Sequence, residues 1–204
     1  MQVKKENIRL KVVRTARKTF LEKGFSDTSM RTIAKRAGVG LSNIYNYFRD
    51  KDEIFQEILS PAVGALEHII NEHNAESNVS LDIFSSQEYL RENTRTFVDL
   101  ILQYREELNL LLLKSHGSKL EGYKENFIQR HTQIGVEYLR LMKEKYPEVN
   151  IDISDFFIHI MSSWWISTLS EIVMHNLERR ELERFILEYM EYCTAGWKQI
   201  MKVR

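Results

Sequence analysis

The fold is decided by residues 28–51, which read TSMRTIAKRAGVGLSNIYNYFRDK. Thr28 and Ser29 are both preferred N-cap residues, so a short helix is predicted to begin at one of them. Gly38 would end that helix, because glycine adopts the left-handed C-cap conformation without steric cost. A second short helix is predicted at about residues 41–48. Two short helices around a glycine turn form a helix-turn-helix, in which the second helix enters the DNA major groove.

Helices are predicted on both sides of this stretch. Apolar residues repeat with helical spacing over residues 6–22, and Gly24 follows as a C-cap. Asp50 and Glu53 have the spacing of a capping box, so a further helix is expected to begin at about residue 51. Pro61 is expected to kink that helix. The same reasoning places later helices at about 86–103, 105–115, 121–146, 154–177 and 180–202.

The composition indicates an all-α chain. The 204 residues include only 8 Gly and 2 Pro, and 43% of them are apolar, which is enough for a packed core. Residues 74–80 are polar and indicate a loop. We expect an N-terminal three-helix domain with the helix-turn-helix at residues 1–52, followed by a larger helical domain at residues 53–204.

Charge is distributed unevenly along the chain. Residues 1–50 carry 12 Lys and Arg against 4 Asp and Glu, whereas residues 51–204 carry 17 against 25, so a net charge of about +8 is followed by about −8. A basic segment attracts phosphates and an acidic remainder repels them, which favours one DNA-binding end. Cys193 is the only cysteine and cannot form an intrachain disulfide, and Met1 precedes charged residues instead of an apolar signal segment. We therefore expect a cytoplasmic protein.

The second helix of the motif has an apolar side and a polar side on a helical wheel. The apolar side, which would pack on the rest of the domain, comprises Leu41, Ile44 and Phe48. The polar side, which would read bases, comprises Ser42, Asn43 and Asn46. Asn46 is central, and its amide can pair bidentately with adenine. Tyr45 and Tyr47 lie on the two flanks, where phenolic hydroxyls can reach phosphates.

This stretch resembles the DNA-binding domain of the tetracycline-repressor (TetR) family of bacterial regulators. The positions that match the family pattern are Thr28, Ser29, Ile33, Ala34, Ala37, Gly38, Val39, Tyr45, Tyr47, Phe48 and Lys51. The positions that depart from it are Gly40, Leu41 and Ile44. The resemblance implies DNA contacts from Arg31, Ser42, Asn43, Tyr45, Asn46, Tyr47 and Lys51. Lys51 has a separate physical reason, since a helix N-terminus also attracts phosphate.

The resemblance further implies that the larger domain binds a ligand and dimerises. The predicted helix from Asp155 to Asn176 is apolar on nearly all sides, so it must be covered by more than one layer. The residues expected at a four-helix dimer interface are Ile160, Trp164, Leu182, Ile186, Tyr189, Cys193, Gly196 and Ile200. A symmetric homodimer would hold two recognition helices about 34–36 Å apart and so read a palindromic operator.

Members of the family usually enclose a small-molecule site in this domain. The candidates for contacts with a small apolar or aromatic effector are aromatic and polarisable residues on the middle helices: Phe97, Tyr104, His116, Tyr123, Phe127, His131, Trp164 and Trp165. Periodicity does not separate such residues from plain core. His68, Glu72 and His73 share a helical face, but such faces are commonplace on solvated helices, and we expect no metal site.

The sequence carries no pattern typical of catalysis. We find no phosphate-binding glycine loop, no Cys/His cluster and no nucleophile turn, so we expect neither an enzyme nor a cofactor. His159 with Ser162 or Ser163 is interpreted as a hydrogen-bonded core pair. The prediction is a DNA-binding transcriptional regulator that acts, by analogy with the family, as a ligand-responsive repressor. The alternative is a DNA-binding regulator without a small-molecule effector, which is controlled by a protein partner or is constitutive.

Overall fold

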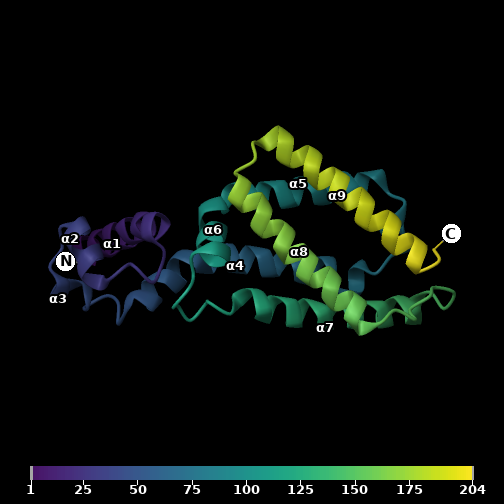
Figure 1. Ribbon diagram of the computed structural model, residues 1–204, viewed down its shortest axis with the longest axis horizontal. Helices are drawn as coiled ribbons and strands as arrows, with labels where there is room; N and C mark the ends of the chain where they lie inside the picture. The colour runs from purple at the N-terminus through teal and green to yellow at the C-terminus, as the bar shows by residue number, and fades with distance from the viewer. Residues whose placement is uncertain (1, 204) are drawn as a thin grey trace. The chain divides into compact units, whose positions relative to one another are not determined.

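The computed structural model describes residues 2–203, which form helices and, within that range, no strand (Figure 1). The helices are α1 (Gln2–Lys23), α2 (Met30–Ala37), α3 (Leu41–Ile44), α4 (Lys51–His73), α5 (Gln87–Gln103), α6 (Arg105–Leu113), α7 (Tyr123–Lys145), α8 (Asp155–His175) and α9 (Arg179–Ile200). Short 3-10 helices occupy Glu76–Asn78 and Leu81–Phe84. The prediction of an all-α fold is confirmed. None of the described helices is both long and apolar enough to cross a bilayer.

The chain divides into two compact units, and neither is continuous in sequence. The first unit contains the residues up to Gly64 and the segment Glu106–Tyr123, and the second contains Ala65–Arg105 and the residues from Lys124 onward. Helix α4 therefore begins in the first unit and ends in the second. The sequence predicts a domain boundary after residue 52, whereas the first unit continues along α4 to Gly64. It also includes Glu106–Tyr123, and no local sequence pattern connects this segment with the motif.

The caps of the motif follow the predicted chemistry. Ser29 is the N-cap of α2, and its Oγ accepts a hydrogen bond from the Thr32 N–H at 3.1 Å. Thr28, the other candidate, is buried and donates its hydroxyl proton to the Gly24 carbonyl at 2.7 Å. Gly38 (φ 60°) and Gly24 (φ 76°) both have left-handed backbone conformations, which favour glycine. Both predicted glycine stops are thus confirmed.

Helix α3 is shorter than predicted, because it ends at Ile44 and not at about residue 48. Its N-cap is Gly40, which provides no side-chain hydrogen bond. Beyond Ile44 the chain continues as a tighter turn, in which the Tyr47 N–H donates to the Ile44 carbonyl at 2.9 Å. Hydrogen bonds of this i→i+3 type are usual where a helix end tightens. Residues 45–48 thus extend α3 as a turn.

The start of α4 differs from the predicted capping box in one partner. Asp50 Oδ1 accepts from the Glu53 N–H at 2.8 Å, as an N-cap does. Glu53 Oε2 accepts from the backbone N–H of Arg49 at 2.6 Å, and not from that of Asp50. Both carboxylates therefore lie at the positive end of the α4 dipole and stabilise the start of the helix. Helix α4 continues through Pro61 without interruption.

Three phenylalanines form the centre of the first unit. Phe20, Phe25 and Phe55 are buried. The ring centroids of Phe20 and Phe25 lie 5.8 Å apart, and each lies 5.0 Å from that of Phe55. Aromatic pairs at these distances attract one another beyond the effect of their buried area. The cluster joins α1, the α1–α2 turn and α4, so the motif rests on a well-packed base.

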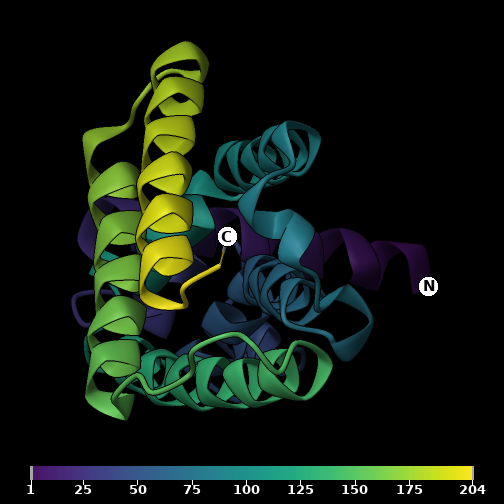
Figure 2. The ribbon, with the colours of Figure 1, turned by 90° about the vertical axis from the view of Figure 1, so that its right-hand side faces the viewer.

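In the second unit, α5 packs against α9. Figure 2 shows α8 and α9 upright, and the turn that joins them begins at Asn176, which has a left-handed backbone (φ 51°). Helices α7 and α8 approach closely at Gly135, where an added Cβ would lie 2.8 Å from Ile158 Cγ2. A side chain at this position would push the two helices apart, and glycine permits the contact.

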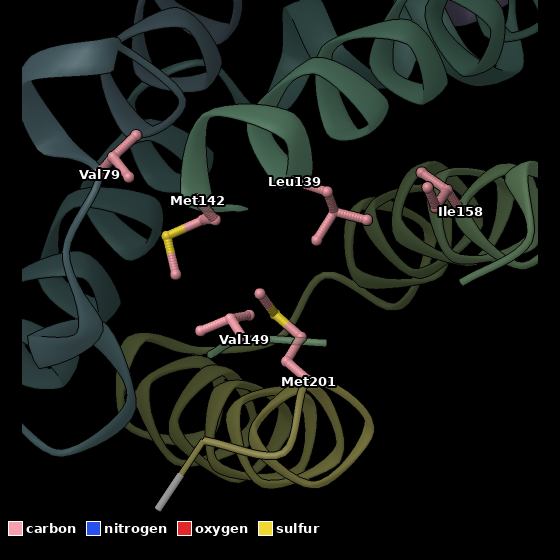
Figure 3. Close-up of a cluster of buried hydrophobic side chains, with 6 residues drawn as sticks. All are labelled: Val79, Leu139, Met142, Val149, Ile158 and Met201. Atoms are coloured by element: carbon pink, nitrogen blue, oxygen red, sulfur yellow. The ribbon is translucent and has the colours of Figure 1, made fainter. Parts of the chain in front are cut away.

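A hydrophobic cluster joins α7, α8 and the segment that follows α9 (Figure 3). Its buried members are Val79, Leu139, Met142, Val149, Ile158 and Met201. Asn150 binds to the same region through its N–H to Met201 O and its side-chain amide to Ile200 O, both at 2.9 Å. Three members of the cluster also line a cavity, and these are Leu139, Ile158 and Met201.

Candidate functional site

The recognition segment, which we define as residues 40–48, buries its apolar side chains and exposes polar ones. Ile44 and Phe48 are 0% and 2% exposed. The exposed side chains are Ser42, Tyr45 and Asn46, while Leu41, Asn43 and Tyr47 are half-buried. Asn46 Nδ2 donates to Asn43 Oδ1 over a long 3.4 Å, which leaves the Asn46 carbonyl oxygen and its other N–H for a base. The residues assigned to base reading therefore share one accessible surface.

On the first unit, several exposed cations have no acidic partner among the described residues. They are Lys11, Arg14, Lys18, Lys23, Arg31 and Lys35. Arg36, in contrast, pairs with Glu22 at 2.6 Å, and Arg9 pairs with Glu57 at 2.5 Å. Cations without a protein counter-ion are the ones that release ions from DNA when they meet phosphate. Arg31, which the family resemblance assigns to DNA, belongs to this group.

Lys51, which the sequence assigns to a phosphate contact, is half-buried and binds within the protein. Its Nζ donates to the backbone carbonyls of Phe25 (2.8 Å), Ser26 (3.3 Å) and Thr28 (2.9 Å). It also lies 4.1 Å from the centroid of the Phe25 ring. A lysine ammonium has three donors, and all three are used. Burial lowers the pKa of Lys51 below its usual value. The side chain clamps the α1–α2 turn to the start of α4.

The segment 106–123 binds the same turn from another part of the chain. The Phe25 N–H donates to Lys114 O at 3.0 Å, and Ser26 Oγ donates to His116 O at 2.7 Å. These bonds tie two consecutive residues of the turn to the loop that follows α6. No local sequence signal predicts this attachment, because its partners are about 90 residues apart.

Charged groups strengthen the attachment. Arg17 of α1 pairs with Glu106 at 2.8 Å and with Glu107 at 2.6 Å. At the opposite end of the segment, the Lys119 N–H donates to Asp52 Oδ1 at 2.8 Å. Hydrogen bonds to ionised groups are stronger than those between neutral groups. The DNA-binding motif is therefore built into a unit that includes α6.

The second unit encloses a cavity of about 280 Å³. Four of the residues predicted for an effector site line this cavity: Phe97, His131, Trp164 and Trp165. The other predicted residues lie elsewhere: Tyr104 follows the end of α5, His116 and Tyr123 belong to the first unit, and Phe127 is buried against Trp165. The lining residues that were not predicted for an effector site include Tyr89, Asn93, Tyr138, Ser162, Tyr189 and Trp197. Helical periodicity shows which residues share a face, but not which face borders a cavity.

One wall of the cavity is aromatic. The Trp165 ring stacks on Phe127, with centroids 5.2 Å apart and planes 15° apart. It also stacks on His131 at 5.9 Å and 24°. Phe97 meets the same ring edge-on at 5.9 Å. Stacked and edge-on arrangements at these distances hold the rings in fixed orientations.

His131 and Ser162 join α7 to α8, with His131 Nδ1 and Ser162 Oγ 2.9 Å apart. Burial lowers the pKa of His131 to about 4, so the ring is neutral at physiological pH. Of the two serines predicted as partners of His159, Ser162 is excluded, because its hydroxyl bonds to His131 and to the Ile158 carbonyl at 3.0 Å. His159 stacks on Phe156 at 6.2 Å instead.

The residues predicted for dimerisation divide between the interior and the surface of the chain. Leu182 and Ile186 are 0% and 6% exposed, so they pack within the single chain and are withdrawn from the interface prediction. The members that line the cavity are Trp164, Tyr189 and Cys193. The members at the surface are Ile160, Gly196 and Ile200. The apolar residues that recur every three or four positions in α9 thus lie partly in the interior of the chain and partly on its surface.

Known proteins share both the motif and the fold. Residues 12–58 match the family described as bacterial regulatory proteins, tetR family. An uncharacterised helix-turn-helix transcriptional regulator, YhgD of Bacillus subtilis, is 25% identical over 131 residues, which cover 62% of this chain and 68% of that protein.

Solved structures extend the likeness to nearly the whole chain. A putative TetR-family transcriptional regulator from Syntrophomonas wolfei has a TM-score of 0.62 at 17% identity and covers 94% of this chain and 96% of its own. NalD, the secondary repressor of the MexAB-OprM multidrug efflux pump in Pseudomonas aeruginosa, has a TM-score of 0.63 at 20% identity. The match covers 91% of this chain and 96% of the NalD chain. With the motif at residues 12–58 and the fold over most of its length, the chain belongs to the TetR family of helix-turn-helix transcriptional regulators.

Proposed function

We propose that this regulator binds a palindromic operator in the cytoplasm as a homodimer, represses transcription, and leaves the DNA when a small molecule occupies the cavity of the second unit. The observation that carries the proposal is the recognition segment, which exposes Ser42, Tyr45 and Asn46 on a buried apolar base. Exposed cations on the same unit supply the charge that phosphates require. Repression is supported by NalD, a repressor of similar fold.

A homodimer is supported by the surfaces of α8 and α9. Of the nine large apolar residues that are exposed on the described chain, five lie on these two helices: Phe156, Ile160, Met174, Tyr192 and Ile200. Phe156 and Tyr192 are 71% and 69% exposed. Concentrated apolar surface marks an interaction site. Dimerisation would also double the DNA contacts of a recognition segment that is too short to bind tightly alone.

We expect Phe156→Ala to weaken the homodimer by roughly thirtyfold, which corresponds to the ~2 kcal/mol typical of an aromatic anchor. Sedimentation over a range of protein concentrations measures the change. Val136→Ala is the matched control, because Val136 is 37% exposed but lies on α7. If the dimer dissociation constant is the same for the parent and Phe156→Ala, this end of α8 does not belong to the interface.

Occupancy of the cavity can influence the first unit through the chain itself. The backbone passes between the units after Gly64, after Arg105 and after Tyr123. Residues that line the cavity lie on α4, α5 and α7, the helices next to these three crossings. A ligand that shifts these helices would change the spacing of two recognition segments, and DNA accepts only a spacing near one helical turn. By linkage, DNA must weaken ligand binding by the same factor.

Asn46→Ala tests the assignment of base reading. An amide that pairs bidentately with a base contributes about 1–3 kcal/mol of discrimination, so we expect a loss of sequence preference of that size. The operator is first selected from random duplexes with the parent protein, and the affinities for operator and scrambled DNA are then compared. Asn71→Ala, an exposed amide in the second unit, is the control. Equal weakening on both DNAs would assign Asn46 to the phosphates.

A further inference from the structure

The lining of the cavity excludes ionic partners for a ligand. Among the described residues that line it, none is Asp, Glu, Lys or Arg. Two histidines line it, and burial lowers the pKa of both, to about 4 for His131, so these rings are neutral at physiological pH. A charged ligand would lose its hydration without gaining a counter-ion, which is strongly unfavourable. The cavity therefore favours an uncharged molecule.

The walls favour a flat ring system. Trp165 and His131, which line the cavity, have ring planes 24° apart, and Phe127 packs against both from outside the lining. Trp164 and Tyr189 lie together elsewhere in the unit, with centroids 4.9 Å apart, and both line the cavity. Aromatic ligands gain offset-stacked or edge-on contacts with such walls beyond the burial of their area. A volume of about 280 Å³ is at the small end for ligand sites, so the ligand is compact.

Three lining residues of α7 follow helical spacing on one face: His131, Gly135 and Tyr138. At a rise of about 1.5 Å per residue, the first and last are roughly 10 Å apart along the helix axis. Gly135 has no side chain between them, because Ile158 of the crossing helix occupies the space that a Cβ would need. Between the two polar side chains, the Ile158 side chain therefore packs against the backbone of α7.

His131 offers a hydrogen-bond acceptor. The Ser162 hydroxyl has one proton, which it donates to the Ile158 carbonyl at 3.0 Å. Ser162 Oγ must then accept from His131, so the proton of the neutral imidazole is on Nδ1. The remaining hydrogen-bonding site of the ring is the lone pair of Nε2.

Tyr138 offers a donor. Its phenolic oxygen is shielded from solvent and has no hydrogen-bond partner among the described residues. Burial raises the pKa of this phenol, so it keeps its proton at physiological pH. A buried hydroxyl without a partner is unfavourable, and a ligand oxygen that reaches it gains a hydrogen bond without breaking another.

We propose that the cavity binds an uncharged, planar aromatic compound with two polar ends, one that donates a hydrogen bond to His131 Nε2 and one that accepts from Tyr138 Oη. The chemical class is that of compact aromatic diols and hydroxyaryl ketones. This ligand class belongs to the cavity that the proposed function assigns to the effector. Binding of the ligand does not depend on the proposed function, but its effect on DNA does.

The test uses three probes of one shape on the full-length protein, with binding measured by calorimetry. We expect 4,4′-dihydroxybiphenyl to bind about tenfold more tightly than 4-hydroxybiphenyl, because it makes one more hydrogen bond. Biphenyl-4-carboxylate should bind at least tenfold more weakly than the diol, because its charge has no partner. A carboxylate that binds as well as the diol, or a diol that does not bind, overturns the proposal.

Variants locate the two hydrogen bonds. Tyr138→Phe should remove the preference for the second hydroxyl, so that diol and mono-ol bind alike, and His131→Phe should do the same while the aromatic wall is kept. Because the Tyr138 hydroxyl has no partner, Tyr138→Phe should melt at the parent temperature or above it. Tyr146→Phe is the control, since Tyr146 is half-buried and does not line the cavity. An unchanged diol preference in Tyr138→Phe overturns the assignment of the donor.

A separate measurement distinguishes this proposal from the proposed function. The affinity for operator DNA is determined with and without saturating 4,4′-dihydroxybiphenyl. Tight diol binding with the expected variant pattern, but unchanged DNA affinity, supports the ligand class and contradicts ligand-controlled release. If the protein binds operator DNA specifically but does not bind the diol, the result contradicts the ligand class and leaves the DNA-binding part of the function intact.

Discussion

Lys51→Met is expected to lower the free energy of unfolding of the first unit by about 3 kcal/mol and to reduce DNA binding through that loss. The Nζ of Lys51 donates to three carbonyls of the α1–α2 turn, and methionine keeps the length of the side chain without any donor. Hydrogen bonds from a charged group contribute about 1.5–3 kcal/mol each, and bonds that share one donor group are not additive. Amide hydrogen exchange over residues 24–37 measures the loss directly.

Lys35→Met is the matched control, because Lys35 is exposed and has no ion pair among the described residues. It should leave exchange in the turn unchanged. All three tryptophans, Trp164, Trp165 and Trp197, lie in the second unit, so tryptophan fluorescence reports whether that unit remains folded. If Lys51→Met exchanges like the parent and only the salt dependence of DNA binding falls, then Lys51 contacts phosphate and the clamp is incidental.

The affinity for operator DNA is expected to fall on the order of a thousandfold between about 50 and 200 mM salt. The reason is the set of exposed cations on the first unit that lack a protein counter-ion, presented twice by a homodimer. Each cation that neutralises a phosphate releases a counter-ion, and the slope of log affinity against log salt counts these events. Fluorescence anisotropy of a labelled operator at five or more salt concentrations gives the slope.

Two neighbouring arginines provide a matched pair for this measurement. Arg31 is exposed and has no ion pair among the described residues, whereas Arg36 pairs with Glu22 at 2.6 Å. Arg31→Ala should reduce the slope by about two in a dimer, one for each copy, and Arg36→Ala should change it little. A flat salt dependence of the parent protein would refute phosphate-driven binding. Equal effects of the two substitutions would show that the Glu22 pair does not compete with DNA.

The helix-turn-helix could be predicted in detail because its signals are local. Ser29 caps α2 through an N–H three residues away, and Gly38 ends it through its own backbone conformation. The burial of Ile44 and Phe48 follows from helical spacing. The length of α3 could not be predicted, because Gly40 at its start provides no side-chain cap and the ends of weakly capped helices are set by their surroundings.

The hydrogen bonds of Lys51 show what local reasoning misses. A lysine at a helix N-terminus has the same sequence signal whether it points to phosphate or into the protein. The α1–α2 turn presents three carbonyls to it from residues more than 20 positions earlier, and only the folded chain brings them together. The buried positions of Leu182 and Ile186 illustrate the same limit, since an apolar stripe does not state whether its partner is the same chain or another.

The sequence by itself determined that the chain is helical, where the DNA-binding motif lies and which side of its second helix is polar. Caps, glycine stops and periodicity act over a few residues, so their physics is contained in the order of the amino acids. The tertiary structure alone decided that 106–123 belongs with the motif, that Lys51 is a clamp, and that His131 and Tyr138 line one cavity. Those relations depend on contacts between residues distant in sequence, and such contacts form only when the whole unit packs.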